Sequence, residues 1–524
     1  MIESFARARS PQALTVSDNS HPLRHLLEVR PTFLRLAFFA AGAVLTIAFA
    51  PLGLYGVAPL VVLPLLTAFL HAEPREAGRY AFWFGVGLFL FGTYWLYTSI
   101  HVFGQAPLWI AVLLMVGLVV IMGWYFAAIG WLITVLSAGS PWRLVAVAPA
   151  GWVAVEWFRG WFLTGFPWMS LGYSQIDSPL AGWLPLFGVY GASFLVVLSA
   201  SAFFVVLNRS GRARRIAVAI AVLPWLGGAA LQWIPWAESA GESRATTIVQ
   251  GGVPQDRKWL PEQFSVTLDL YRNSILEHPD SELIVWPEVA IPAAIDQVEG
   301  YLEMLQLDLG SRGQTLLLGV LERDKADIHN SVLMLEGDSR QVYRKRHLVP
   351  FGEYFPVPDW VRERMRLMSL PYTDMTQGQP EQPLLQTGDG DRLAVAICYE
   401  DAYGAEQLYA LPEATILINV SNDAWFGDSI APHQHLEIAR VRAVEAARYV
   451  VRATNNGISA FIGPRGELLQ TAPQFRYAAM TMDVPPMRGA TPYSISGNWP
   501  IISLALLTVA GFGWRTLNDR RGRP

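Results

Sequence analysis

The sequence has little cysteine and little charge. Its 524 residues include one cysteine, Cys398, so no disulfide can form within the chain, and no Cys/His spacing typical of zinc sites occurs. Charged residues make up 16% of the chain, below the roughly 25% of soluble domains. The formal net charge of −4 argues against a strongly basic chain that binds nucleic acid. The chain is instead 52% hydrophobic with 20 Trp, which indicates that much of it meets lipid.

Long apolar runs fill the first half of the chain and recur near its end. A helix that spans a bilayer needs about 20 mostly apolar residues. Eight runs approach that length, at 32–50, 54–71, 80–98, 109–136, 142–158, 187–207, 215–233 and 498–514. The first run starts near Thr32 without a convincing cleavage signal, so we expect a retained anchor rather than a secretory signal peptide. The pattern predicts a bundle of about eight transmembrane helices.

The basic residues predict how this bundle is oriented, because cytoplasmic loops carry an excess of Lys and Arg. The N-terminal tail, the loop with Arg75 and Arg79, and the stretches 209–215 and 515–523 are basic, whereas the loop 99–107 has no Lys or Arg. We therefore expect both termini in the cytoplasm and the globular segment outside. The predicted order is an N-terminal extension (1–31), seven transmembrane helices (32–239), a catalytic domain (240–490), a last transmembrane helix (498–514) and a tail (515–524).

The globular segment alternates strand-like and helix-like patterns. Short runs rich in β-branched and other apolar residues occur at 244–250, 281–286, 314–321, 330–335, 392–397, 414–420 and 449–453. Helical patterns begin at Pro261 and Pro432. Strands interleaved with helices are typical of an α/β fold with a buried sheet.

Cys398 directly follows one of these strand-like runs. Active-site groups of α/β folds gather at strand ends, so the thiol is either a nucleophile or inert packing. A nucleophilic thiol needs a base or a positive charge nearby. His433 and His435 are candidates, although both fall on a predicted helix where a surface position is equally compatible. No G-x-S-x-G motif is present, and this His pair lacks a third metal ligand, so we expect no metal site.

Two further stretches differ from ordinary surface. Glu288 interrupts the apolar stretch L-I-V-W-P-E-V-A-I-P, where it is either a general base with a raised pKa or a paired structural carboxylate. Lys345 lies in a basic cluster that leads into the proline-stiffened loop L-V-P-F-G-E-Y-F-P. Such clusters are usually solvated, but a lysine at this place can also be held in a site, where it would stabilise a thiolate or an oxyanion.

Taken together, W-P-E, then R-K-R-H-L-V-P-F-G-E, then I-C-Y-E-D on an α/β domain resemble the nitrilase superfamily. The resemblance implies a four-layer αββα sandwich over roughly 240–485. It also implies that Glu288 is the general base, Lys345 the oxyanion stabiliser and Cys398 the nucleophile.

A nitrilase-like domain before the last of eight spans resembles bacterial apolipoprotein N-acyltransferases. Further motifs of that family are E-W-F-R-G-W-F-L-T-G-F-P-W from 156, V-Q-G-G-V-P-Q-D-R-K-W from 249, S-N-D-A-W-F-G-D from 421, P-H-Q-H ending at His435 and T-N-N-G from 454. This resemblance implies a multi-pass protein of the bacterial inner membrane with its catalytic domain in the periplasm. It implies a phospholipid acyl donor, a diacylglyceryl apolipoprotein acceptor, and neither metal nor organic cofactor.

The same resemblance assigns secondary roles around the three residues. Glu353 is expected to orient Lys345, and Tyr399 and Glu400 to shape the loop of the nucleophile. Trp259 and Trp425 are expected on substrate-binding loops over the site, with ordinary aromatic packing as the alternative.

Two other functions compete with acyl transfer. A membrane-anchored amidase of the nitrilase type would hydrolyse its thioester, although one anchor would suffice for it. A transporter or scaffold with an inactive outer domain would usually carry polar residues within its spans. These runs have few, and Glu156, near the end of one of them, is the clearest.

Overall fold

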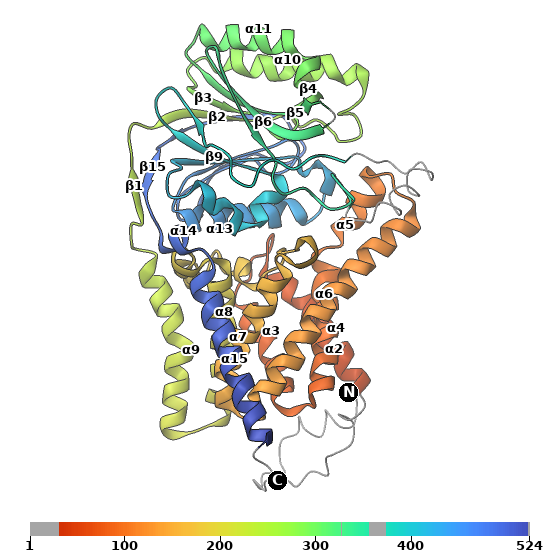
Figure 1. Ribbon diagram of the computed structural model, residues 1–524, viewed down its shortest axis with the longest axis vertical. Coiled ribbons are helices and arrows are strands. Elements are labelled where there is room, and N and C mark those ends of the chain that lie inside the picture. The colour runs from red at the N-terminus through yellow and green to blue at the C-terminus, as the bar shows by residue number, and fades with distance from the viewer. Residues whose placement is uncertain (1–30, 326, 356–373, 522–524) are drawn as a thin grey trace.

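The computed structural model describes residues 31–325, 327–355 and 374–521. An elongated body of helices carries an α/β domain at one end, and both bodies share one large interface (Figure 1). Most of the predicted N-terminal extension and the end of the predicted tail lie outside the described residues.

The helical body is built from the apolar runs. Its helices are α2 (Pro31–Leu45), α3 (Val57–His71), α4 (Pro74–Gly92), α5 (Trp95–Tyr97), α6 (Leu108–Ser137), α7 (Pro141–Arg159), α8 (Leu184–Asn208), α9 (Gly211–Leu231) and α15 (Trp499–Arg521). Each of the eight predicted runs overlaps one of them. Proline starts α4 and α7, where its missing N–H would have no partner within the helix.

The helices differ in whether they are long and apolar enough to cross a bilayer. Four of them are, within Leu108–Ser137, Pro179–Asn208, Gly211–Leu231 and Trp499–Asp519. A fifth candidate is a pair, Pro74–Gly92 and Trp95–Phe103, bent by 53° at the break between them. The third predicted run therefore starts six residues earlier than expected and is not one straight helix. The helices at Thr32–Ala48 and Val57–His71 are apolar but shorter.

Two sheets form the centre of the α/β domain. Its strands are β1 (Ala237–Ser239), β2 (Arg244–Gln250), β3 (Leu283–Val285), β4 (Ile291–Ala294), β5 (Thr315–Asp324), β6 (Asp327–Glu336), β7 (Ser339–Arg344), β8 (Leu385–Gln386), β9 (Arg392–Ile397), β10 (Ile416–Ser421), β11 (Val450–Thr454), β12 (Ala460–Ile462), β13 (Leu468–Thr471), β14 (Ala478–Val484) and β15 (Met487–Gly489). One sheet has the order β14-β2-β3-β5-β6-β7 with β4 beside β5, and the other has the order β13-β12-β11-β10-β9-β8. Strands β2, β3 and β5 are parallel, as are β9, β10 and β11.

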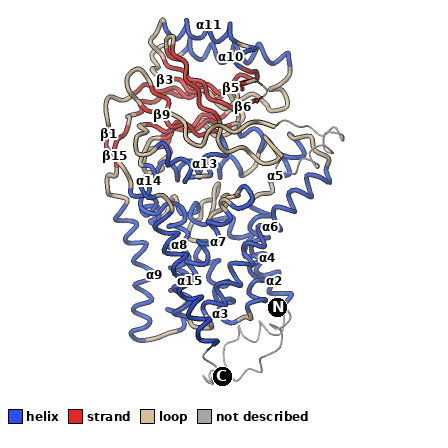
Figure 2. The backbone as a smooth tube through the Cα atoms, in the orientation of Figure 1, coloured by secondary structure: helices blue, strands red, loops and turns tan. Residues whose placement is uncertain are grey.

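Helices cover the outer face of each sheet, as Figure 2 shows. The helices of this domain are α10 (Pro261–Glu277), α11 (Glu299–Gly310), α13 (Ala431–Ala446) and α14 (Pro492–Ser496). One apolar core joins α10 and α11 to the first sheet, a second lies between the sheets, and a third joins α13 to the second sheet. The predicted α/β sandwich is confirmed.

Helix α13 is buried on two sides. Leu436, Ala439 and Ala443 pack on the sheet, whereas Ile438 and Val441 pack with the helical body. Polar side chains of α13 also bind the helical body: Glu437 accepts a hydrogen bond from the backbone N–H of Ala50, at 3.1 Å, and Glu445 accepts one from the backbone N–H of Val189, at 2.8 Å. The helix therefore joins the two bodies of the protein.

Candidate active site

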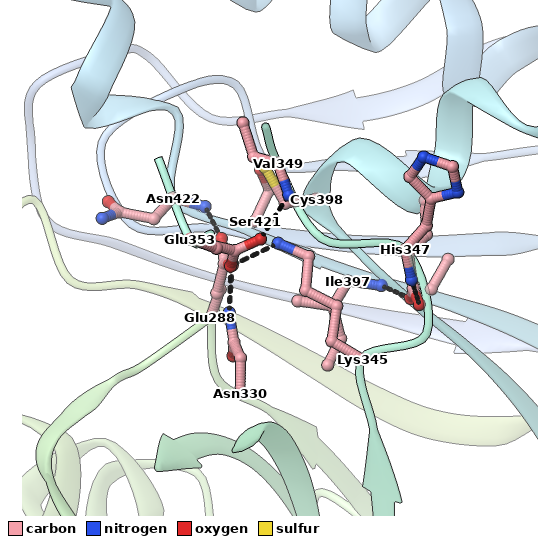
Figure 3. A network of polar contacts seen from close by, with 12 residues as sticks. Glu288, Asn330, Lys345, His347, Val349, Glu353, Ile397, Cys398, Ser421 and Asn422 are labelled. Carbon is pink, nitrogen blue, oxygen red and sulfur yellow. Dashed lines mark hydrogen bonds and ion pairs between the residues drawn. The ribbon is translucent and has the colours of Figure 1, made fainter. Parts of the chain in front are cut away.

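Glu288, Lys345 and Cys398 converge between the two sheets (Figure 3). Glu288 follows β3, Lys345 directly follows β7, and both strands belong to the first sheet. Cys398 directly follows β9 of the second sheet. The three predicted residues, spread over more than a hundred positions of the chain, are thus brought together by the packing of one sheet on the other.

Three donors hold the Glu288 carboxylate. Its Oε1 accepts hydrogen bonds from Lys345 Nζ at 3.2 Å and from Asn330 Nδ2 at 2.7 Å. Its Oε2 accepts one from the backbone N–H of Asn422 at 2.8 Å. With both oxygens bound in a site that is almost closed to water, the carboxylate has one orientation.

The Lys345 ammonium lies between two carboxylates. Its side chain is 1% exposed, and Nζ is 2.8 Å from Glu353 Oε1 and 3.2 Å from Glu288 Oε1. Burial by itself would lower the pKa of Lys345, but Glu288 and Glu353 outweigh it and raise the pKa above its usual value. Lys345 is therefore a fixed positive charge.

Glu353 is in turn held by the backbone. Its Oε2 accepts a hydrogen bond from the N–H of Val349 at 2.7 Å, and its Oε1 accepts one from Asn330 Nδ2 at 3.0 Å. The carboxylate is thereby fixed in the geometry in which it binds Lys345.

Cys398 has an unusual backbone and a protonated thiol. Its φ angle is +52°, in the left-handed region that costs a non-glycine residue about 1–3 kcal/mol and that persists only where the surrounding fold enforces it. Burial raises the pKa of the Cys398 thiol, the Glu288 carboxylate raises it further, and Lys345 opposes both. At neutral pH the resting thiol carries its proton, so a base must remove it before the sulfur can attack.

Glu400 ties the segment after β7 to the segment after β9. This fully buried carboxylate accepts hydrogen bonds from the backbone N–H of Ile397 at 2.6 Å, from that of His347 at 3.2 Å and from the Tyr343 hydroxyl at 3.1 Å. Burial raises the pKa of Glu400, and Arg346 opposes the increase. Its contacts are with backbone that carries Lys345 and Cys398, which is the geometry expected of a residue that shapes the loop.

Tyr399 is the residue after Cys398, and Trp259 and Trp425 lie in segments that follow strands of the same domain. The Tyr399 hydroxyl donates to the carbonyl of Gly165 in the helical body, at 3.4 Å. Trp259 is 53% exposed and Trp425 is 39% exposed, so neither ring is packed in a core. Both tryptophans follow the ends of strands, as the three central residues do, since Trp259 comes after β2 and Trp425 after β10.

Several polar residues of the site were not predicted. Asn330, on β6, and Asn422, after β10, bind Glu288. Lys258 is buried beside them and donates to the backbone carbonyl of Glu288 at 3.2 Å; burial lowers the pKa of Lys258 to about 8, opposed by Glu288. A polar residue such as Asn330 within the apolar strand N-S-V-L-M-L was the available signal.

His433 and His435 are both less exposed than the surface positions that the sequence allowed for them. His433 is half-buried and contacts Gln474, but His435 is 1% exposed because α13 is covered on two sides. Within the described part of the chain, no three His, Cys, Asp or Glu side chains are grouped so that they could hold a metal ion.

Comparison with known proteins connects both bodies to one family. The family model "Apolipoprotein N-acyltransferase N-terminal domain" matches residues 41–202, and "Carbon-nitrogen hydrolase" matches residues 245–493. Among solved structures, an amidase from Nesterenkonia sp. AN1 is 17% identical, with a TM-score of 0.36, over 47% of this chain and 92% of its own. A carbon-nitrogen hydrolase from Helicobacter pylori G27 is also 17% identical, with a TM-score of 0.35, over 50% of this chain and 94% of its own.

Curated relatives match nearly the whole chain. The apolipoprotein N-acyltransferase of Methylococcus capsulatus is 40% identical over 90% of this chain and 94% of its own. The apolipoprotein N-acyltransferase of Azotobacter vinelandii is 40% identical over 93% of this chain and 96% of its own. The one of Pseudomonas aeruginosa PAO1 is 38% identical over 90% of this chain and 93% of its own. The chain is an acyltransferase and belongs to the apolipoprotein N-acyltransferase family.

Proposed function

We propose that this enzyme moves an acyl chain from a phospholipid to the N-terminal amine of the diacylglyceryl-cysteine of an apolipoprotein, with Cys398 as the acyl carrier. The convergence of Glu288, Lys345 and Cys398 is the observation that carries the proposal. Membership of the family supports the two lipid substrates.

In the first half-reaction Glu288 takes the proton of the Cys398 thiol, and the sulfur attacks the ester carbonyl of the phospholipid. The Lys345 ammonium and the backbone N–H of Tyr399 stabilise the resulting oxyanion. The C–O bond of the ester breaks, Glu288 returns the proton to the departing oxygen, and lysophospholipid leaves. Cys398 then carries the acyl group as a thioester. A base is required because the resting thiol is protonated.

In the second half-reaction the amine of the apolipoprotein attacks the thioester and gives a proton to Glu288. The C–S bond breaks, the amide forms, and the proton returns to the sulfur. Amines attack thioesters more readily than oxygen esters, and the two steps let donor and acceptor use the site in turn. The buried site disfavours hydrolysis because it limits the access of water.

The helical body would hold this site at a membrane surface. In the proposal all eight predicted runs span the bilayer, in the order of segments 1–31, 32–239, 240–490, 498–514 and 515–524. The start of α2, the connection from α8 to α9 and the end of α15 lie at the end of the helical body away from the α/β domain (Figure 1). Basic residues occur near these places, which supports cytoplasmic termini and a periplasmic catalytic domain at the bacterial inner membrane.

Glu353, Tyr399 and Glu400 would support the reaction, and Trp259 and Trp425 would contact substrate. The contacts of Glu353 with Lys345 support an orienting role. Both tryptophan rings are exposed, which leaves their faces available to lipid.

Intact-protein mass spectrometry of the enzyme with phospholipid vesicles tests the proposal. We expect a mass gain of one acyl group that hydroxylamine removes and that Cys398→Ala abolishes. An intact phospholipid and no adduct on the folded protein would refute the thioester mechanism. A thioester that water discharges but a diacylglyceryl peptide amine does not would favour the amidase alternative.

A further inference from the structure

His435 occupies a place that the proposed mechanism does not use. Its ring is buried on α13, with Nδ1 2.9 Å from Asp423 Oδ1 and Nε2 3.1 Å from the backbone carbonyl oxygen of Cys398. One ring thus joins a buried carboxylate to the peptide group that follows the nucleophile.

Both partners of the ring can only accept hydrogen bonds. A backbone carbonyl has no proton to give, and Asp423 is ionised: burial would raise its pKa, but Arg452 and His435 outweigh burial and lower it. Arg452 Nη2 lies 2.8 Å from Asp423 Oδ2, and the Ser421 hydroxyl donates to Oδ1 at 2.7 Å. Since each ring nitrogen faces an acceptor, a proton on Nε2 makes the ring a donor to the Cys398 carbonyl.

The ring is enclosed by polar and aromatic groups. Asp423, Asp401 and Arg452 lie near it, and the ring of Trp168 has its centroid 5.6 Å from that of His435. Because Nδ1 faces Asp423 and Nε2 faces the Cys398 carbonyl oxygen, neither ring nitrogen is directed at the Cys398 thiol, and the histidine is not placed as the base of this nucleophile.

The Cys398 carbonyl and the Tyr399 N–H belong to one planar trans peptide group, so they point in opposite directions. A donor that holds the oxygen therefore also sets where the N–H points. A hydrogen bond to the oxygen also polarises the amide and makes its N–H a stronger donor.

We propose that His435 is a positioning residue, which holds the Cys398–Tyr399 peptide so that the Tyr399 N–H meets the oxyanion in both half-reactions. This inference rests on the proposed thioester mechanism. The left-handed φ of +52° at Cys398 makes such a holding contact necessary, because the peptide that follows the residue has to be kept in a conformation that is unfavourable by itself.

The neighbour of His435 anchors the same helix in the helical body. Gln434 accepts a hydrogen bond from Trp168 Nε1 at 2.8 Å and donates one to the carbonyl of Gly92 at 3.2 Å. The peptide that lines the oxyanion position is thus held from a helix whose own position is set by the part of the protein that would meet lipid.

Two substitutions of His435 separate its two contacts. His435→Asn places an amide N–H where Nδ1 binds Asp423 but is too short to reach the Cys398 carbonyl. His435→Gln places an amide N–H near Nε2 and keeps a neutral donor for that carbonyl. The matched control is His433→Asn, two residues earlier on α13, where the side chain contacts Gln474 at 3.1 Å and not the site.

Two rates are measured on each purified full-length variant: thioester formation from phospholipid vesicles in a single turnover, and alkylation of Cys398 by iodoacetamide, which forms no oxyanion. We expect His435→Asn to slow thioester formation about ten- to a hundredfold, less than the loss of a whole oxyanion donor. We expect His435→Gln to be slowed less, and His433→Asn to match the parent. Alkylation should stay close to the parental rate in all three.

Thioester formation at the parental rate in His435→Asn would overturn the inference. A proportional loss of alkylation would also overturn it, because the histidine would then act on the thiol or on the folding of the site. If the parent protein itself forms no thioester, the proposed function is refuted. The parent is measured beside the variants, so this outcome is distinguished from a failure of the inference about His435.

A measurement on the unaltered protein does not depend on how the variants fold. Nitrogen NMR of the ¹⁵N-histidine-labelled chain, with His435→Gln used only to assign the signal, should show a proton on His435 Nε2, as a donor to the Cys398 carbonyl requires. An unprotonated Nε2 would refute the inference.

Discussion

Replacing Glu353 by glutamine tests how the charge of Lys345 is held in place. The carboxylate accepts three hydrogen bonds, from Lys345 Nζ at 2.8 Å, Asn330 Nδ2 at 3.0 Å and the Val349 N–H at 2.7 Å. An amide has one oxygen, so in Glu353→Gln its NH₂ group must face either the Val349 N–H or the Lys345 and Asn330 donors. One charge-assisted contact is lost whichever way the amide turns.

The size of the effect follows from that contact. A hydrogen bond to a charged group contributes about 1.5–3 kcal/mol. If the whole loss appears in the transition state, at about 1.4 kcal/mol for each factor of ten, thioester formation slows about ten- to a hundredfold. Lys345 would also move toward Glu288, the remaining carboxylate, and hold the base more tightly.

The assay is single-turnover thioester formation by intact-protein mass spectrometry, with thermal unfolding recorded in parallel. The matched control is Glu322→Gln, which removes a carboxylate that binds Arg344, the residue before Lys345, at 2.7 Å and outside the site. Because that pair is partly exposed, the control should lose about 1 kcal/mol of stability or less and keep its rate. A parental rate in Glu353→Gln, or an equal loss in the control, would refute the orienting role.

Three further predictions concern the thiol, its loop and the domain interface. Since burial raises the pKa of the Cys398 thiol, its alkylation by iodoacetamide should become faster from about pH 7 to about pH 9, and a plateau there would contradict this. Glu400→Gln should lower the free energy of unfolding by about 1–3 kcal/mol, seen as a lower melting temperature, because an amide cannot serve the backbone N–H groups of Arg346, His347 and Ile397, all of which donate to the carboxylate. Gln434→Leu should lower the melting temperature because the buried indole of Trp168 loses its acceptor, whereas that of Trp95 keeps the Gly92 carbonyl; an unchanged melting curve would show that this contact adds no stability.

The strands that the sequence predicts have buried faces, although the short buried strand β12 was missed as well. All seven predicted runs correspond to strands, because an apolar, β-branched run is typical of a strand covered by helices or by a second sheet. Strand β7 was missed because its sequence S-R-Q-V-Y-R carries the charges of a sheet edge. Strand β13 was missed for a similar reason, since all of its residues are exposed and it too lies at an edge.

The residues of the candidate site likewise comprise some that the sequence indicated and others that only the structure identified. Glu288, Lys345 and Cys398 could be singled out because each stands in a local context that ordinary surface lacks, and the structure brings them together. The roles of Asn330 and Asn422 could not be predicted, because the local sequence shows a polar residue in or after an apolar strand but not which carboxylate it binds. Their roles depend on contacts between strands of different sheets.

The sequence by itself determined the division into an apolar half and an α/β domain, the buried strands and the chain order of the three central residues. These depend on composition, periodicity and neighbouring residues, which can be read along the chain. Only the tertiary structure decided that α13 is buried on two faces and that His435 meets one acceptor at each ring nitrogen. The physical reason is that burial, charge state and hydrogen-bond geometry depend on groups far apart in the sequence, and only the packing of the two bodies sets their distances.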